Sequence, residues 1–455
     1  MQAWRGELEM SGCQAADWNL HQCSACGALK NTFAPVFYSV GTESLTDKSK
    51  SAKTSLMHFF EKHGNRDLEG ATTMNACYGG TAALLNSTAW VESSEWDGRY
   101  ALAVAADIAV YEEGAARPTG GAGAVAVLVG PGAPLRLTPQ TRATHAADVW
   151  DFYKPEMQSE YPTVDGKLSQ SCYIRAVDDC YTRHMDKVQR QRTRDGVIAP
   201  EAGLLTLADA YDFNVFHSPY NKLVQQSFAR LFVNDARRLV AAGQALPEYL
   251  TPLAPWAEAE YEGTIMDRDL MKASVEVANA YYATMVGPSD KLSKNIGNTY
   301  TAAVFANLLC LVNNKGSEMV NKNTAVFSYG SGAIASMYGI DGVDTTADGY
   351  LDTLHMANRV TGPTLAQLNG YEHPLGARSD KQFTLQGIAD TVSMDSRLDA
   401  RQAVSPAEYT AALDGRKAHY GQKNYVPSTT AEGLPSGTWY LKQVNEDYTR
   451  VYDRA

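Results

Sequence analysis

The sequence lacks long apolar runs and has few basic residues. No stretch reaches the roughly 20 apolar residues that a membrane-spanning helix needs, so we expect neither such a helix nor a membrane partner. Lysine and arginine number 40 against 51 acidic residues, and the net charge of −11 argues against a nucleic-acid-binding protein. Residues 1–7 lack the features of a signal or transit peptide, which predicts a cytoplasmic location.

Cysteine is also scarce, with seven residues in 455. That number is too small for a disulfide framework, and its being odd fits reduced thiols. Cys23 and Cys26 have the spacing of half a zinc site, but only Cys13 and His21 lie nearby. A zinc site needs a second pair or histidines at matching spacing, so we interpret the spacing as a coincidence and predict no metal site.

Short apolar runs alternate with longer helical segments, which predicts an α/β chain of two comparable halves. The expected strands are residues 34–40, 100–106, 120–130, 211–216, 325–329 and 437–444. The expected helices are residues 46–63, 82–90, 171–192, 221–239, 268–284, 300–312 and 405–417. The glycines at 120–123 lead into a strand and lack the Gly-Lys-Ser/Thr ending of a phosphate loop, so we do not expect nucleotide binding.

Cys77 stands at a turn into a buried helix. Gly79 and Gly80 follow it and let other backbone approach closely, and residues 82–90 are mostly apolar or small. Unpaired N–H groups and the helix dipole at such a position stabilise a thiolate over a thiol, which is the environment of a nucleophile. The alternative is a packed core cysteine, because free cysteine is among the most buried residue types.

Two further turns present a reactive residue beside an apolar strand. Glu43 follows the strand at 34–40, and His217 follows the strand at 211–216. Such turns are where α/β proteins place reactive side chains. A cysteine, a histidine and a carboxylate suffice for covalent acyl transfer. Taken alone, however, His217 also fits a structural histidine and Glu43 a carboxylate in a surface loop.

Seven segments in order resemble the eukaryotic-type 3-hydroxy-3-methylglutaryl-CoA synthases. They are NACYGGTAA (75–83), SEWDGRYAL (94–102), ARPTGGAGA (116–124), DFYKP (151–155), FHSPY (216–220), FSYGSG (327–332) and GTWYL (437–441). The resemblance covers the chain from about residue 40 to its C-terminus. It implies a thiolase-like α/β fold of two pseudo-duplicated halves in an αβαβα arrangement. It also implies a homodimer that condenses acetyl-CoA with acetoacetyl-CoA in the mevalonate pathway of isoprenoid and sterol biosynthesis, with these CoA thioesters as substrates and no metal or redox cofactor.

The resemblance also assigns roles to residues. It implies that Cys77 is acetylated, that Glu43 is the general base and acid, and that His217 holds the acetoacetyl thioester. The backbone N–H groups of Cys77 and Ser331 would form an oxyanion hole, a kind of site in which each donor contributes about 3 kcal/mol. The other positions matched are Asn298 as a substrate contact, Tyr78, Asp107, Thr119, Asp151 and Ser169 as supporting active-site residues, and Lys222 with Ser218 and Pro219 on the CoA side.

The start of the chain departs from the family. Members begin with a further strand, helix and strand before the glutamate motif, and residues 1–35 do not resemble that segment, so we expect these N-terminal strands to be missing or replaced. The expected division is 1–35 (atypical), 36–170 (the half with the nucleophile) and 171–455 (the half with the histidine and asparagine motifs). Two alternatives stay open. One is another thiolase-superfamily enzyme such as a ketoacyl-ACP synthase III, and the other is a catalytically impaired family relative.

Overall fold

A computed structural model of the chain describes residues 37–45, 47–61, 64–346, 384–392, 394–427 and 439–455. Two of our expectations lie outside the described residues. These are the missing or replaced strands at 1–35 and the interpretation of Cys23 and Cys26. Four cysteines that are described, Cys77, Cys172, Cys180 and Cys310, are free thiols in buried positions, as the count predicts.

The first sheet has the strand order β2-β1-β3-β4. Its strands are β1 (Phe37–Gly41), β2 (Thr72–Thr73), β3 (Ala101–Ala109) and β4 (Gly121–Val129). β1 is parallel to β2 and β3, whereas β4 is antiparallel to β3. β3 runs three residues beyond the expected end, so Asp107 lies inside the strand. β4 is half-buried along its whole length and not fully buried as we expected, because no described strand pairs with its outer edge.

The second sheet repeats this plan with the strand order β5-β11-β10-β9. Its strands are β9 (Phe213–Phe216), β10 (Asn323–Gly330), β11 (Ile334–Gly342), β5 (Leu135–Leu137) and β6 (Ala143–Ala146), the last also paired with β11. β9 and β10 are parallel and β11 is antiparallel to β10, as in β1, β3 and β4. The division at residue 170 stays a prediction, and the sheets themselves part earlier, because β5 and β6 belong to the second sheet.

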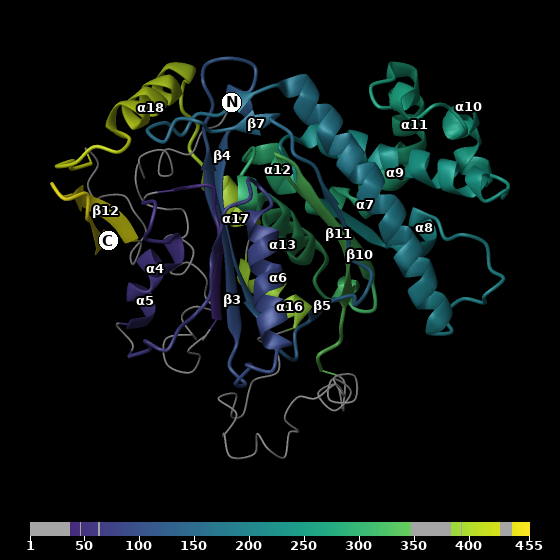
Figure 1. Cartoon of the computed structure of the whole chain (residues 1–455), viewed down its shortest axis with the longest axis horizontal. Helices are drawn as coiled ribbons and strands as arrows, with labels where there is room; N and C mark the ends of the chain where they lie inside the picture. Colours follow the sequence, from purple (N-terminus) through teal and green to yellow (C-terminus); the bar gives the residue numbers. More distant parts are fainter. Residues whose placement is uncertain (1–36, 46, 62–63, 347–383, 393, 428–438) are drawn as a thin grey trace.

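Two helices lie between the sheets. α6 (Gly79–Val91) and α13 (Ala303–Lys315) share one apolar cluster with β3 of the first sheet and with β9, β10 and β11 of the second. On the outer face of the first sheet, Leu56 of α4 (Ala52–Leu56) packs with Tyr38 and Val104. On the outer face of the second sheet lie α7 (Gly166–Arg194), α9 (Asn221–Ala241) and α11 (Arg268–Met285). The layers therefore run αβαβα, as predicted (Figure 1).

The prediction of a single helix over residues 46–63 is wrong. The chain forms two short helices there, α4 and α5 (His58–Glu61). The carboxylate of Asp47 accepts the backbone N–H groups of Ser49 and Lys50, which holds a turn instead of a first helical turn. Ser51 then caps α4 through its hydroxyl, which accepts the N–H of Thr54. The helix start is thus decided by which of several polar residues takes the cap.

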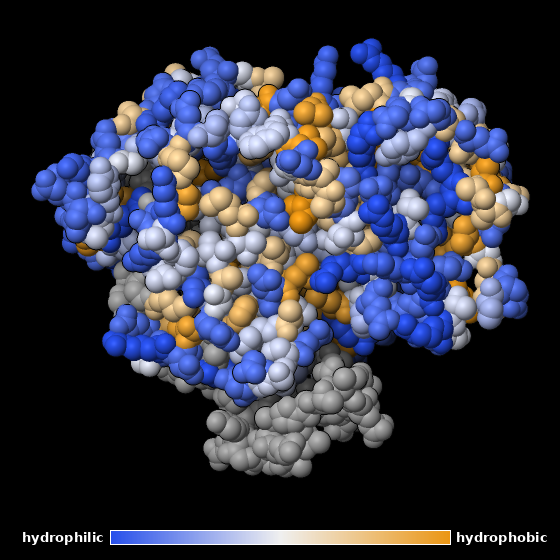
Figure 2. All heavy atoms as spheres, in the orientation of Figure 1, coloured by the Kyte–Doolittle hydropathy of each residue, from blue (hydrophilic) through white to orange (hydrophobic). Residues whose placement is uncertain are grey.

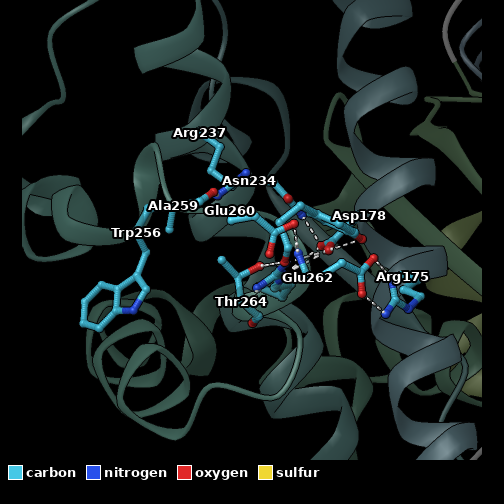
Figure 3. A network of polar contacts seen from close by, with 11 residues as sticks. Arg175, Asp178, Asn234, Arg237, Trp256, Ala259, Glu260, Glu262 and Thr264 are labelled. Atoms are coloured by element: carbon cyan, nitrogen blue, oxygen red, sulfur yellow. Dashed lines mark hydrogen bonds and ion pairs between the residues drawn. The ribbon is translucent and has the colours of Figure 1, made fainter.

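A buried polar network joins the outer helices of the second half (Figure 3). Asp178 of α7 and Arg230 of α9 form an ion pair with 2.8 Å between Oδ2 and Nη2, and their side chains are 5% and 3% exposed. Asn234 and Tyr261 donate to the same carboxylate. The network therefore attaches α9 to α7, and both helices begin beside residues of the candidate site. α7 itself begins five residues before its expected start, because Asp165 caps it.

The remaining helices and strands were expected in part. α11, α13 and α18 (Pro406–His419) confirm three predicted helices, and β12 (Trp439–Val444) confirms the last strand. The other described elements are β7 (Phe152–Tyr153), β8 (Thr163–Val164), α8 (Leu207–Ala210), η1 (Arg117–Thr119), η2 (Glu248–Leu253), α10 (Ala254–Ala257), η3 (Glu262–Thr264), η4 (Gly287–Ser289), α12 (Lys291–Asn295), η5 (Tyr300–Ala302), η6 (Gly316–Met319), α16 (Leu385–Val392), α17 (Met394–Asp399) and β13 (Arg450–Arg454).

The surface is mixed in character. On the face seen in Figure 2, apolar side chains lie in small separate groups among hydrophilic ones. Within the part of the chain that the structure describes, no helix is long and apolar enough to cross a membrane.

Candidate active site

Cys77 lies two residues before α6, in the turn that the sequence predicts. Ala76 has φ of 44°, so the chain turns sharply just before the cysteine. The start of α6 is pressed against its neighbours. A Cβ on Gly41 would lie 2.2 Å from the backbone carbon of Gly79, and a Cβ on Gly80 would lie 2.4 Å from the carbonyl oxygen of Thr301. Gly41 and Gly80 therefore let β1 and η5 approach the cysteine turn. For Gly80, this is the close approach that the sequence predicts.

Glu43 meets Cys77 at the end of β1. The thiol of Cys77 donates to Oε1 of Glu43 at 3.4 Å, and Nζ of Lys154 donates to Oε2 at 2.7 Å. The Glu43 side chain is only 7% exposed and that of Lys154 is 23% exposed. The structure thus brings together two residues that are 34 positions apart, and it adds a cation that the sequence did not identify.

Asp107 fixes the backbone around Glu43 at the end of β1. Its Oδ1 accepts the Thr42 hydroxyl and the N–H of Glu43, both at 2.8 Å. Its Oδ2 accepts the N–H and the hydroxyl of Thr301. Burial and the charge of Glu43 raise the pKa of Asp107 to about 7, against the opposing effect of Lys154. Asp107, near the C-terminal end of β3, therefore joins the end of β1 to η5.

The thiol of Cys77 is not activated in the way that its position at a helix start suggests. Burial raises the pKa of Cys77 well above its ordinary value, and the neighbouring carboxylates Glu43 and Asp107 raise it further. Burial disfavours the charged thiolate, and the two neighbouring carboxylates repel it. Together these effects outweigh the stabilisation of the thiolate by the helix terminus. At neutral pH Cys77 is a thiol, and it needs a base to act as a nucleophile.

His217 follows β9 directly, as predicted, and is fully buried. Its two ring nitrogens have no hydrogen-bond partner among the described residues, and burial lowers its pKa to about 3. Its backbone is fixed by Phe327 and by the hydroxyl of Tyr173, which donates to the His217 carbonyl at 2.5 Å. No described hydrogen bond joins His217 to Cys77 or Glu43. The ring of Tyr173 lies beside that of His217, with 6.4 Å between the ring centroids.

Ser331 lies in the turn between β10 and β11, which passes over the cysteine turn. A Cβ on Gly330 would lie 2.6 Å from the carbonyl oxygen of Asn75 and 2.7 Å from the amide nitrogen of Tyr78. Asp151 holds this turn in place, because its Oδ1 accepts the N–H of Gly332 at 3.0 Å.

Asp151 also contacts Ser169, another of the predicted supporting residues. The hydroxyl of Ser169 in α7 donates to Oδ2 of Asp151 at 2.9 Å, and the Tyr329 hydroxyl donates to the same oxygen at 3.4 Å. Asp151 is fully buried, and it stands immediately before β7 and Lys154. These two predicted residues therefore join the turn of Ser331 to the segment that carries Lys154.

Asn298 is joined to the surroundings of Cys77 through Tyr111. Its N–H donates to the carbonyl of Thr119 at 2.7 Å, and its side-chain amide donates to the Tyr111 hydroxyl at 3.3 Å. Tyr111, Tyr300 and Cys77 belong to one small buried cluster. The hydroxyl of Thr119 itself donates to the carbonyl of Ala116, so the predicted threonine acts in the structure through its backbone.

The other predicted residues lie around this centre in different ways. The hydroxyls of Tyr78 and Ser336 are 2.6 Å apart, which anchors the start of α6 to β11. The Ser218 hydroxyl is buried without a hydrogen-bond partner among the described residues, and Pro219 next to it is half-buried. Ser218 lines a small crevice with residues from both sides of Asn298 in the sequence, among them Gly297 and Thr299. Lys222 is exposed in the first turn of α9, and no contact of its side chain is described.

Lys154 and Tyr300 are the residues that sequence reasoning missed. Lys154 stands in a matched segment and Tyr300 two residues after Asn298, but a lysine beside aromatic residues gives no sign from sequence that it pairs with a distant carboxylate. The charge pairing that reveals Lys154 is a tertiary contact with a residue 111 positions away. Among the described residues, no group of three or more histidine, cysteine or acidic side chains is arranged to hold a metal ion.

Comparison of the sequence with known families gives two matches that together span most of the chain. The model described as hydroxymethylglutaryl-coenzyme A synthase N terminal matches residues 34–134. The model described as hydroxymethylglutaryl-coenzyme A synthase C terminal matches residues 135–360 and 373–455. The two models meet where β5 begins, which is also where the chain enters the second sheet.

Curated relatives agree with these matches. The chain is 40% identical to hydroxymethylglutaryl-CoA synthase A of Dictyostelium discoideum over 91% of its own length and 75% of that protein. It is also 40% identical to the cytoplasmic and mitochondrial hydroxymethylglutaryl-CoA synthases of Homo sapiens, again over 91% of its length and over 72% and 74% of theirs.

Solved structures share the fold at lower identity. A structure titled MvaS in complex with 3-hydroxy-3-methylglutaryl coenzyme A superposes with a TM-score of 0.69 at 22% identity, covering 98% of this chain and 88% of that one. PksG, an HMG-CoA synthase from Bacillus subtilis, superposes with a TM-score of 0.64 at 19% identity, covering 97% and 90%.

Proposed function

Because the chain belongs to the hydroxymethylglutaryl-CoA synthase family, we propose that Cys77, Glu43 and His217 carry out its condensation of acetyl-CoA with acetoacetyl-CoA. This acyl transfer is the step of the mevalonate pathway that forms 3-hydroxy-3-methylglutaryl-CoA. The observation that carries the proposal is the hydrogen bond from the Cys77 thiol to Oε1 of Glu43 at 3.4 Å. A nucleophile and a base within this reach are the minimum for covalent acyl transfer.

In the first step, Glu43 takes the proton of the Cys77 thiol as sulfur attacks the carbonyl carbon of acetyl-CoA. The raised pKa of Cys77 makes this transfer necessary, since the thiol does not ionise by itself at neutral pH. The C–S bond to CoA breaks, and the departing thiolate takes the proton from Glu43. Acetyl-Cys77 and free CoA result, and Glu43 is again a carboxylate.

In the second step, Glu43 removes a proton from the methyl group of acetyl-Cys77. The resulting enolate carbon attacks the keto carbon of acetoacetyl-CoA, and Glu43 returns the proton to the new alkoxide. Water then hydrolyses the thioester bond to Cys77, which releases the product and restores the thiol. The thioester acidifies the methyl group and the keto carbon is already electrophilic, so we propose that no metal or redox cofactor takes part.

His217 and Ser331 act on oxygen atoms in this proposal. The buried His217 is neutral, since its pKa is lowered to about 3, and a neutral imidazole donates one hydrogen bond to the acetoacetyl thioester without adding a charge. The N–H groups of Cys77 and Ser331 receive the oxyanion at the acetyl carbon. The close approach of Gly330 to the cysteine turn supports this pairing. Asn298 contacts the substrate, and Lys222, Ser218 and Pro219 lie on the CoA side.

We further propose that the active form is a cytoplasmic homodimer that binds CoA thioesters. Large apolar side chains are exposed near the site, among them Trp150 at 70% and Met74 at 54%. Exposed residues of this kind are typical of interfaces between subunits. The location rests on the cytoplasmic relatives, and localisation of the tagged protein in its own cells tests it. Sedimentation analysis tests the dimer, and a monomer that is fully active would contradict it.

The condensation itself is tested by mixing purified protein with acetyl-CoA and acetoacetyl-CoA and identifying the products by mass spectrometry. We expect 3-hydroxy-3-methylglutaryl-CoA and free CoA in equal amounts from the natural protein and from Cys172→Ala, which removes another buried thiol. We expect no product above background from Cys77→Ala. Product formed by folded Cys77→Ala would refute the role of Cys77, and a folded natural protein without product would identify a catalytically impaired relative.

A further inference from the structure

The charged group nearest to Glu43 has no role in the chemistry described so far. Lys154 lies between β7 and the loop that follows, and its Nζ is 2.7 Å from Oε2 of Glu43. We propose that Lys154 is a positioning residue for the condensation, which holds one carboxylate oxygen of Glu43 so that the other faces the sulfur of Cys77. The inference rests on the proposed functions of Cys77 and Glu43.

The two oxygens of Glu43 have separate partners. Oε1 accepts the thiol of Cys77, and Oε2 accepts the ammonium of Lys154. The backbone N–H of Glu43 is bound in addition by Asp107. With its backbone and one oxygen fixed, the carboxylate keeps little rotational freedom, so Oε1 stays where the methyl group of acetyl-Cys77 forms.

The surroundings of Lys154 suit a cation that stays charged and does not move. Its Nζ lies 4.6 Å from the ring centre of Tyr300 and 5.8 Å from that of Phe152. Burial alone would lower the pKa of Lys154, but the charge and the hydrogen bond of Glu43 outweigh it and the pKa is raised. Asp107 and Cys77 also face this ammonium and raise its pKa further.

The balance of charge explains why the cation matters. Glu43 and Asp107 lie within one buried corner with Cys77, and Lys154 is the cation that acts on all three. Two carboxylates that close to each other do not both stay ionised in a buried site without a cation. Without Lys154 the corner therefore takes up a proton. Asp107, whose pKa is already raised to about 7, is the group that takes it up, and a neutral Asp107 holds the N–H of Glu43 less firmly.

The segment that carries Lys154 is attached to the turn that contains Ser331. Asp151, three residues before it, binds the N–H of Gly332 and the hydroxyl of Ser169. β7 between Asp151 and Lys154 pairs with β8. The segment from Asp151 to Lys154 therefore contacts both the turn of Ser331 and the carboxylate of Glu43.

The test compares Lys154→Met, which keeps the length of the side chain but not the charge, with Lys154→Arg, which keeps the charge. Lys167→Met is the matched control, because Lys167 is an exposed lysine in the first turn of α7. Thermal unfolding shows that each variant is folded. Steady-state rates are then measured from pH 5 to 9, together with exchange of the acetyl methyl protons in heavy water, which reports their removal directly.

We expect Lys154→Met to lose about 100-fold in kcat and in methyl exchange at pH 7, with KM changed little, because the base is misplaced. The acidic limb of its pH profile moves to higher pH, since Lys154 is one of the groups that lower the pKa of Asp107. Lys154→Arg recovers most of the rate and the position of the limb. In a Glu43→Gln background, Lys154→Met adds little further loss, because the two residues act as a unit.

A natural rate and an unmoved limb in folded Lys154→Met would overturn the proposal. So would an equal loss in Lys154→Arg, or a full additional loss in the Glu43→Gln background. These outcomes differ from failure of the proposed function, which shows itself as the absence of condensation in the natural protein.

Discussion

The ion pair between Asp178 and Arg230 allows a sharp prediction about what holds the second half together. The guanidinium of Arg230 donates from Nε to both carboxylate oxygens of Asp178, at 2.9 and 3.1 Å, and from Nη2 to Oδ2 at 2.8 Å. It also donates to the carbonyl and to the hydroxyl of Thr264, both at 2.9 Å (Figure 3). The pair therefore links α7, α9 and the segment before α11.

Arg230→Met removes the charge and all of these donors while keeping an apolar stem of similar length. Asp178 then loses its guanidinium partner and keeps the neutral donors Asn234 and Tyr261. A buried carboxylate that loses its cation costs about 3–5 kcal/mol of unfolding free energy. We expect urea unfolding, followed by circular dichroism, to show a loss of that size with little change in slope.

Arg175→Met is the control for this change. Arg175 and Glu262 form a bidentate pair beside the first one, but their side chains are 36% and 61% exposed. An exposed pair contributes about 1 kcal/mol or less. The double variant Asp178→Asn with Arg230→Met removes both charges, and we expect it to recover part of the loss. A loss in Arg230→Met no larger than that in Arg175→Met would refute the reasoning.

Two further predictions concern the site. Asp107 has a pKa of about 7 in the folded chain, well above that of an unfolded aspartate, so its ionisation favours unfolding. The stability that it contributes is fully present below about pH 4 and is lost as the pH rises to about 7. The free energy of unfolding, measured across this range, should decline less in Asp107→Asn than in the natural protein. An equal decline in the two proteins would contradict the assignment. Gly330→Ala places a Cβ 2.6 Å from the carbonyl oxygen of Asn75, so the turn of Ser331 must move. We expect kcat to fall at least tenfold while the protein stays folded, and a natural kcat would speak against the oxyanion hole.

Features that depend on local sequence could be predicted, whereas features that depend on contacts between distant residues could not. The turn at Cys77 and the positions of Glu43 and His217 beside strands were predicted, because local patterns decide where strands end. The start of α4 was missed because both Asp47 and Ser51 accept backbone N–H groups, Asp47 those of Ser49 and Lys50 and Ser51 that of Thr54, so either residue type fits a helix cap.

The electrostatics of the site was beyond the sequence. A helix terminus predicts a lowered pKa for Cys77, but its burial and its carboxylate neighbours raise that pKa. The neighbours come from β1 and β3, which bring Glu43 and Asp107 to the cysteine from separate parts of the chain. For the same reason, the role of Lys154 became visible only in the folded chain.

The central claim is that Cys77 carries the acetyl group, and intact-protein mass spectrometry with peptide mapping tests it most directly. The protein is incubated with acetyl-CoA alone and quenched in acid, with Cys77→Ala as the blank. We expect one added acetyl group, located on the peptide that contains Cys77 and absent from the variant. A folded protein that carries no acetyl group, or carries it on another residue, would contradict the account.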